Sequence, residues 1–369
     1  MLSGRTLLSG VVGLLLIGCS QGSEDVQTST DALHKGGSDQ VITVDHFVSV
    51  SNGVTLHVVE KYTDGCGHRP NHRALLMLSG TLVSSTEFNL PDPYNALDRA
   101  ARAGYYAYAV DYEGYGESTL PADGKIVTAP RLLGEMGSVI EWIRHTRHVS
   151  RVDLLGSSLG SSLAVELGGP NSPINHHHVG KLVLTSVVYK NVTPAFQAAF
   201  FSPQFEQLLL TIPGGYIQTT PDAYAPIVLF ADQAAADDVD AEVPGVYAVG
   251  PTLAGFTLPI YPAQDGRSPA MQFWGDEDPI TPFSDLQQFQ SEYGGDASYT
   301  VLSGSGHIPF YGPAKDTFWN DSFAFLEHGG DCWGGDCGDT DYDSGSCGVD
   351  SNAPDQSNVQ NAKQSCLAW

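Results

Sequence analysis

The sequence predicts an α/β fold, in which a mostly parallel sheet carries helices on both faces. First, apolar runs of strand length alternate with amphipathic runs of helix length along most of the chain, as expected of parallel strands joined by crossover helices. Second, one predicted strand turns directly into a helix through Gly156–Gly160. Third, the segments that flank Ser51–Gly53 alternate apolar and polar residues. An Asn-Gly turn between such segments predicts an antiparallel hairpin, which we place at one edge of the sheet.

The predicted elements follow one another in a regular order. The hairpin takes in Val41–Val50 and Val54–Tyr62. Apolar runs predict buried strands at Ala74–Leu78, Tyr105–Val110, Val152–Leu155, Lys181–Ser186, Ala270–Trp274 and Ser298–Leu302. Helical spacing of apolar residues predicts helices at Leu132–Ile143, Ser161–Leu167, Phe283–Tyr293 and Ala314–Glu327. A further helix is expected to begin at Asp92-Pro93, as cap and first residue, and to end at Gly104.

Two stretches interrupt this order. Residues 190–265 are rich in Pro, Ala, Phe and Tyr and predict an insertion with some helix rather than another alternating unit. Residues 329–369 are rich in Cys, Gly and Asp and predict an acidic tail. We therefore expect one folded domain over residues 41–328, with residues 190–265 inserted into it.

The N-terminal residues have the features of an export signal. Arg5 precedes an apolar run, Leu7–Gly18, which is too short to span a membrane. The run ends at Leu16-Ile17-Gly18-Cys19, which resembles a bacterial lipobox, where cleavage precedes a cysteine that becomes lipidated. We expect residues 1–18 to be a lipoprotein signal peptide, residues 19–40 a flexible tether, and the exported protein to be anchored by Cys19, at the outer membrane or cell surface. The alternative is an ordinary secretory signal followed by a chance cysteine.

The cysteines and the acidic tail predict disulfides rather than metal sites. Disulfides are the default outside the cytoplasm. Five of the six cysteines remain if Cys19 is lipidated: Cys66, Cys332, Cys337, Cys347 and Cys366. Two tail disulfides with Cys66 free, or a bridge from Cys66 to the tail, both stay open. Three other clusters resemble metal sites, but we interpret them as solvated loops and predict no metal and no cofactor: Cys66 with His68 and His72; His176–His178; and the tail acids Asp339, Asp341, Asp343 and Asp350, which lack the closing Glu of a calcium loop.

Charge narrows the classes of partner. The chain has 17 basic and 42 acidic residues and a formal net charge of −25 at pH 7. This balance argues against nucleic acid and against anionic lipid headgroups as partners. We expect a small-molecule substrate and contact with the membrane only through the lipid anchor, and we leave the oligomeric state open.

The candidate nucleophile is Ser158. Gly156 and Gly160 lie two residues either side of it, where a strand that turns abruptly into a helix needs room for close backbone contact. Such a turn exposes the serine hydroxyl at the carboxyl end of the sheet, beside the first amides of the helix, where negative charge is stabilised. A Gly/Ser-rich turn without a catalytic role is the alternative interpretation of these residues.

A serine hydroxyl needs a base, and the base needs a carboxylate. His307 follows the last predicted strand in a loop of small residues, at the same edge of the sheet as Ser158, and is the candidate base. Asp278 follows the strand before it and is the candidate acid. Asp276 is the rival, and we expect it to stabilise the turn. The backbone amides of Thr81 and Leu159 are the candidate oxyanion donors.

These motifs together resemble the α/β-hydrolase family over about Val41–His328, the insertion excepted. Gly156–Gly160, Gly275–Asp278 with Pro282, and Gly306-His307 match its nucleophile, acid and base in the family's chain order. Asp111–Ser118 is similar to the family's D-x-x-G-x-G-x-S loop. Ser79 and Ser157 stand where many members have His, which weakens any assignment to a subfamily.

The resemblance implies an α/β-hydrolase fold in which residues 190–265 form a lid over the site. Two apolar stretches of this insertion, Ala195–Phe201 and Leu208–Ile212, are expected either to line an acyl pocket or to pack the lid against the body. The implied activity is cleavage of a carboxylic ester through an acyl-enzyme. Lipase-like and aminopeptidase-like hydrolysis are the alternatives, and acyl transfer would use the same site. In the family's dehalogenases and epoxide hydrolases, Asp stands in place of Ser158. A non-catalytic surface lipoprotein is the alternative from a different class.

Overall fold

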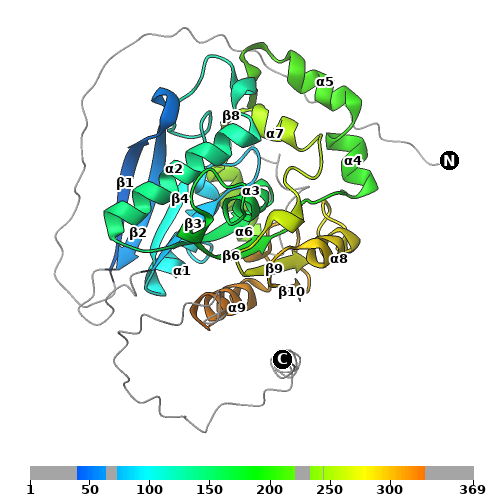
Figure 1. Ribbon diagram of the computed structural model, residues 1–369. Coiled ribbons are helices and arrows are strands. Elements are labelled where there is room, and N and C mark those ends of the chain that lie inside the picture. The colour runs from blue at the N-terminus through cyan, green and yellow to red at the C-terminus, as the bar shows by residue number, and fades with distance from the viewer. Residues whose placement is uncertain (1–39, 64–72, 221–232, 244, 329–369) are drawn as a thin grey trace, which may run out of the picture. The chain divides into compact units, whose positions relative to one another are not determined.

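The prediction of an α/β-hydrolase fold with a mostly parallel sheet is confirmed. A computed structural model describes residues 40–63, 73–220, 233–243 and 245–328 (Figure 1). The main sheet has eight strands in the order β1-β2-β4-β3-β5-β6-β9-β10. These strands are β1 (Val41–Ser49), β2 (Thr55–Thr63), β3 (Ala74–Leu78), β4 (Tyr106–Val110), β5 (Val152–Ser157), β6 (Val179–Thr185), β9 (Ala270–Gly275) and β10 (Ala297–Leu302).

The direction of the strands follows the predicted arrangement. Strands β1 and β2 form an antiparallel hairpin, and β2 pairs antiparallel with β4. From β4 to β10 every neighbouring pair is parallel. The carboxyl ends of β3, β5, β9 and β10 therefore lie at one edge of the sheet, which is where an open parallel sheet binds its ligands.

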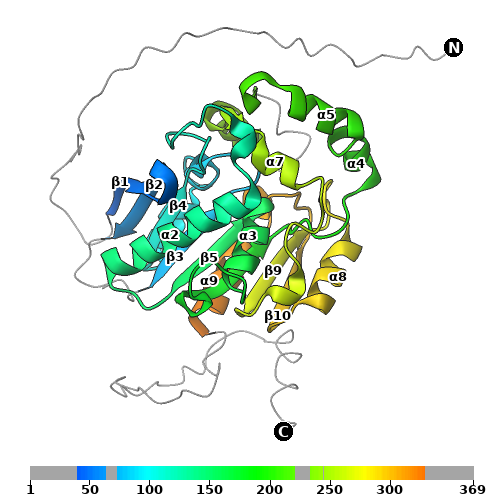
Figure 2. The same cartoon turned by 45° about the horizontal axis from the view of Figure 1, so that its top comes forward.

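Helices cover both faces of this sheet (Figure 2). The strands β3 and β5 are buried along their whole length, and their successive side chains point to opposite faces because a strand has a period of two. Leu76 and Leu154 thus join one apolar core, and Leu75 and Leu155 join the other. The first core packs against α2 (Ala129–Arg147), α3 (Leu159–Leu167) and α8 (Phe283–Glu292), and the second against α1 (Ala96–Arg102) and α9 (Lys315–His328).

Helices α1 and α3 begin elsewhere than the sequence predicted. Helix α1 was expected to begin at Asp92-Pro93, but Asn95 is its cap, and its side chain accepts a hydrogen bond from the Asp98 amide at 2.8 Å. Asp92 and Asn95 are both residue types that favour the N-cap of a helix, so residue type alone does not decide between the two positions. Helix α3 begins at Leu159 rather than Ser161. The helix therefore starts directly after Ser158, closer to that hydroxyl than expected.

Residues 190–265 lie between β6 and β9 and break the alternation. They contain α4 (Pro194–Phe200), α5 (Pro203–Thr211), α6 (Gln233–Glu242) and α7 (Gly250–Ala254). The described part also has four short 3-10 or strand segments: Pro213–Gly215, β7 (Tyr216–Gln218), β8 (Val246–Ala248) and Ala263–Asp265. Strands β7 and β8 pair antiparallel in a small second sheet that the sequence did not predict. Figure 2 shows α4, α5 and α7 on the side where the parallel strands of the main sheet end.

Several predictions lie outside the described residues. These are the signal peptide, Cys19, the tether, the loop with Cys66, His68 and His72, and the cysteine-rich tail with the cluster Asp339, Asp341, Asp343 and Asp350. Across the described ranges no group of His, Cys, Asp and Glu side chains is arranged to hold a metal ion, and the triple His176–His178 is a short 3-10 turn. No helix within those ranges has the length and apolar character that crossing a membrane requires.

Candidate active site

Ser158 lies at a strained turn between β5 and α3. Its backbone has φ 51° and ψ −110°, a conformation that a residue with a side chain adopts only when the surroundings enforce it. The two flanking glycines explain how the turn closes. A Cβ on Gly160 would lie 2.0 Å from the Leu78 carbonyl oxygen, and one on Gly156 would lie 2.5 Å from the Ser161 backbone. Only glycine fits at either place, as the sequence pattern predicted.

His307 and Asp278 form a buried pair at the same edge of the sheet. The His307 ring nitrogen Nδ1 lies 2.9 Å from Oδ2 and 3.0 Å from Oδ1 of Asp278. Only 2% of His307 and 8% of Asp278 are exposed. The other ring nitrogen, Nε2, is buried and has no hydrogen-bond partner in the described part of the chain. An imidazole oriented through Nδ1 and unpaired at Nε2 can exchange a proton with a hydroxyl that comes within hydrogen-bond distance. Among the described residues no hydrogen bond joins Nε2 to Ser158 Oγ.

Asp278 is held in place by its own loop. Its Oδ1 accepts hydrogen bonds from the amides of Ile280 at 2.8 Å and Thr281 at 3.0 Å. Asp276, the rival acid, is exposed and accepts from the Gly304 amide at 2.6 Å and the Ser303 hydroxyl at 3.0 Å. Asp276 therefore ties the two loops together, as expected of a turn-stabilising residue, and makes no contact with the imidazole.

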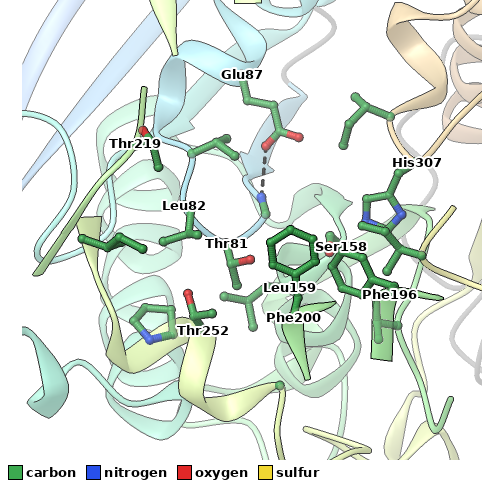
Figure 3. Close-up of a pocket in the computed structure, with 18 of the residues that line it drawn as sticks. Thr81, Leu82, Glu87, Ser158, Leu159, Phe196, Phe200, Thr219, Thr252 and His307 are labelled. Carbon is green, nitrogen blue, oxygen red and sulfur yellow. Dashed lines mark hydrogen bonds between the residues drawn. The ribbon is translucent and has the colours of Figure 1, made fainter. Parts of the chain in front are cut away.

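Ser158 and His307 line one cavity, of about 300 Å³, together with the predicted oxyanion residues (Figure 3). Thr81 and Leu159 both border it. Leu159 is the first residue of α3, so its amide has no partner within the helix. The Thr81 amide makes no backbone hydrogen bond to another described residue. Both amides are thus available to an oxygen atom bound beside Ser158.

A buried carboxylate beside these residues was not found from the sequence. Glu87 lies on the 3-10 turn Ser85–Phe88 and borders the same cavity. Its Oε1 accepts a hydrogen bond from the Ser157 hydroxyl at 2.7 Å, and its Oε2 accepts from the Gly80 amide at 3.0 Å. Burial raises the pKa of Glu87 to about 7, against the opposing effects of these two donors and of positive charge on His307. No local pattern around Glu87 signals this position.

The loop that begins at Asp111 has a structural role. Asp111 accepts hydrogen bonds from His57 Nδ1 at 2.9 Å, the Ser85 amide at 2.8 Å and the Glu117 amide at 3.0 Å. These contacts lower the pKa of Asp111, which burial alone would raise. The carboxylate thereby fixes the turn that carries Glu87. The sequence singled out this loop but not its partner His57, which lies on β2.

The insertion supplies the apolar wall of the cavity. Of the first apolar stretch, Phe196, Phe200 and Phe201 line it. None of the second stretch, Leu208–Ile212, lines it: Leu209 is buried, whereas Leu208 and Leu210 are exposed. Of the two roles left open for the second stretch, lining the pocket is therefore not observed, because helix α5 leaves Leu208 and Leu210 exposed. Other residues of the insertion complete the wall: Phe205, Ile217, Val239, Val243, Pro251, Leu258 and Ile260.

Comparison with known proteins agrees with this fold. The family model described as "Alpha/beta hydrolase family" matches residues 75–318. The chain therefore belongs to the α/β hydrolase family, and we conclude that it is a hydrolase.

Individual relatives are more distant. An epoxide hydrolase from Caballeronia sordidicola is 30% identical over 127 residues, which are 34% of this chain and 33% of that protein. A monoglyceride lipase from Saccharomyces cerevisiae has 13% identity and a TM-score of 0.60, covering 78% of this chain and 96% of the lipase. A thermophilic esterase from Thermogutta terrifontis has 12% identity and a TM-score of 0.56, covering 78% of this chain and 98% of the esterase. At these identities the two structures support the fold alone, and the aligned segment spans about a third of the length of the curated relative.

Proposed function

We propose that this protein is a serine hydrolase that cleaves a neutral, apolar carboxylic ester through an acyl-enzyme. Ser158 Oγ attacks the carbonyl carbon while His307 Nε2 takes the hydroxyl proton. Asp278 holds the imidazole in the required tautomer and stabilises its positive charge. The amides of Thr81 and Leu159 hold the oxyanion of the tetrahedral intermediate. The imidazolium then returns its proton to the departing alcohol oxygen, which leaves an ester of Ser158.

The second half of the reaction repeats these steps with water. His307 removes a proton from the water, whose oxygen attacks the acyl carbon. The tetrahedral intermediate collapses to the carboxylic acid as His307 returns the proton to Ser158 Oγ. The single observation that carries this proposal is the buried His307–Asp278 pair. Its imidazole has no hydrogen-bond partner at Nε2 among the described residues, and His307 borders the same cavity as Ser158.

The lining of the cavity favours an uncharged, apolar acyl group. The wall is largely aromatic and aliphatic, and within the described residues only Glu87, His307 and Tyr311 border it with a titratable side chain. No lysine or arginine from those residues lines it. A free carboxylate on the acyl group would therefore be buried without a partner, which costs binding free energy. The volume of about 300 Å³ is at the lower end for ligand sites, which favours short to medium acyl chains.

The rival reactions fit this cavity less well. An aminopeptidase must bind the ammonium group of its substrate, but both oxygens of Glu87 already accept hydrogen bonds from Ser157 and Gly80. An epoxide hydrolase that forms a covalent intermediate needs a carboxylate nucleophile, because attack by a hydroxyl on an epoxide gives an ether that water does not cleave. Ser158 stands at that position, so we do not extend the activity named for the curated relative to this chain.

A substrate series tests the proposed ester specificity. The purified soluble domain is assayed with p-nitrophenyl esters of increasing acyl length, a dicarboxylic monoester, an aminoacyl amide and styrene oxide. We expect kcat/KM to be highest for short to medium neutral acyl groups and to fall by about 10-fold or more for the charged acyl group. Hydrolysis of the amide at a rate comparable with the best ester, or turnover of the epoxide alone, would contradict ester specificity.

We further propose that the protein is exported and anchored to a bacterial membrane through lipid on Cys19. The support is the sequence of residues 1–19 alone. Cells that express the full chain are fractionated, and the wild type is expected in the detergent-extractable membrane fraction. Cys19→Ala is expected to remain uncleaved or to appear in the soluble exported fraction. Equal fractionation of the two proteins would argue against lipidation.

A further inference from the structure

Glu87 is a fully buried carboxylate that the proposed reaction does not use. The side chain borders the substrate cavity, yet only 2% of the residue is exposed. Figure 3 shows Glu87 among the residues that line the cavity, with its hydrogen bond to the Gly80 amide drawn as a dashed line. A buried carboxylate is costly to keep unless its contacts serve a purpose or compensate it. Its contacts therefore indicate what it does.

Both partners of Glu87 lie next to the proposed oxyanion donors. Gly80, bonded to Oε2, directly precedes Thr81. Ser157, bonded to Oε1, directly precedes the nucleophile and lies two residues before Leu159. A single carboxylate thus joins the two separate segments that supply the two amides. The segments are also in close contact, since a Cβ on Gly80 would lie 3.4 Å from the Ser158 Cβ.

The backbone around Glu87 is fixed by two contacts with other parts of the fold and by one hydrogen bond within its own turn. The Ser85 amide donates to Asp111 Oδ1 at 2.8 Å. The Tyr311 hydroxyl donates to the Glu87 carbonyl oxygen. The Ser84 hydroxyl oxygen accepts from the Thr86 amide at 3.3 Å. A carboxylate on so fixed a backbone can set the distance between its two partners rather than follow their movement.

We propose that Glu87 is a positioning residue that holds the Thr81 and Leu159 amides at the separation the oxyanion needs. This inference rests on the proposed function and adds to it a residue that does not touch the substrate carbonyl. Charge-assisted hydrogen bonds are shorter and stronger than neutral ones, so the ionised carboxylate holds the two segments more firmly than the acid does. The protonated acid keeps one oxygen as a full acceptor and must donate from the other.

The titratable groups that face Glu87 are few. They are His307 on the loop after β10, Tyr112 on the loop after β4, and Tyr311 on the 3-10 turn Pro309–Tyr311. Burial and the proximity of Glu87 raise the pKa of both phenols well above the usual value, so neither carries a charge near neutrality. Within the described residues, the ionisation of Glu87 therefore depends on its own pKa and on the charge of His307.

Two variants of Glu87 separate positioning from mere packing. Glu87→Ala removes both contacts, and we expect kcat to fall by about 10² with KM changed less than about 3-fold, comparable to the loss of one oxyanion donor. Glu87→Gln retains the shape, with its carbonyl accepting from Gly80 and its amide donating to Ser157, and is expected to recover most of that loss. The rate of inactivation by a fluorophosphonate, whose adduct places an oxygen between the two amides, should follow kcat in both variants.

A pH series provides the readout that packing alone would not move. Because the pKa of Glu87 is about 7, the Glu87 side chain of the wild type becomes ionised between pH 6 and 8. The glutamine of Glu87→Gln does not titrate. The ratio of kcat for wild type to that for Glu87→Gln should therefore rise over this range. Stability should change in the opposite sense. The folded pKa lies above the ordinary value of 4.5, so the stabilising contribution of Glu87 is present at low pH and is lost as pH rises through about 7.

Glu135→Gln is the matched control. Glu135 is a buried carboxyl group on α2 with its pKa raised by burial and by Glu113 to about 8, and it lies outside the residues that line the cavity. Its replacement should leave kcat and its pH dependence unchanged. If Glu87→Ala fails to fold, Glu87→Gln and the pH series still decide.

The possible failures are distinguishable. Wild-type kcat in a folded Glu87→Ala variant, or a kcat ratio that does not change with pH, overturns the positioning role while leaving the ester hydrolase intact. A wild type that neither hydrolyses esters nor reacts with fluorophosphonate overturns the proposed function, and the role of Glu87 with it.

Discussion

Replacement of Ser158 by alanine should lower kcat by a factor of at least about 10⁴ and abolish labelling by a fluorophosphonate probe. The reason is that the attacking oxygen is lost, and no other hydroxyl in the described chain occupies the turn between β5 and α3. Alanine keeps a Cβ at the strained backbone, so the variant should unfold at nearly the wild-type temperature. An inactive variant that unfolds at the wild-type temperature shows that the nucleophile, and not the fold, has been lost.

Ser161 is the matched control for this experiment. It lies three residues after Ser158 in the first turn of α3 and is buried. Its hydroxyl lies within donating distance of the Gly156 and Thr185 carbonyl oxygens and accepts from the Thr185 amide. Ser161→Ala should therefore lower stability by about 1 kcal/mol or more while the folded protein remains labelled. Labelling that persists in Ser158→Ala would move the nucleophile elsewhere, and an unlabelled wild type would favour the non-catalytic scaffold.

The sequence predicted the candidate catalytic residues best, because each of them follows a strand of the parallel sheet. Ser158, Asp278 and His307 each follow a predicted strand, and parallel strands bring their carboxyl ends to one edge. Their convergence could be predicted without coordinates because strand direction alone determines it. The fixed steric need for Gly156 and Gly160 likewise leaves a local pattern in the sequence.

The contacts around Glu87 could not be predicted because they are not local. Glu87 meets Ser157 from 70 positions away along the chain, and His57 meets Asp111 across 54 positions. Neither contact imposes a spacing that a single sequence displays. The orientation of α5 was also missed, since its apolar residues occur on more than one side and only the packing decides that Leu209 is buried and Leu208 exposed. The structure was thus needed to find the buried polar networks and to decide which side of an insertion helix such as α5 is buried.

Replacement of Asp278 by asparagine should lower kcat by a factor of about 10⁴, or about 5 kcal/mol in the activation free energy, with the fold retained. In the native protein Oδ1 accepts from the amides of Ile280 and Thr281, so the asparagine carbonyl oxygen is expected to take that place. The asparagine NH₂ group then faces His307 Nδ1 in place of Oδ2, which lies 2.9 Å away. Because an NH₂ group donates, Nδ1 must become the acceptor, and the ring proton moves to Nε2.

An imidazole protonated at Nε2 cannot take the proton of Ser158, although every side chain stays in place. The loss should therefore fall on kcat, and substrate binding should change little. Asp276→Asn is the matched control, because Asp276 belongs to the same loop but bonds to Ser303 and Gly304 and not to the imidazole. We expect Asp276→Asn to keep kcat within about 3-fold while lowering the unfolding temperature slightly. The reverse pattern in steady-state kinetics, with Asp276→Asn inactive and Asp278→Asn near normal, would assign the acid to Asp276 and make the buried pair a structural one.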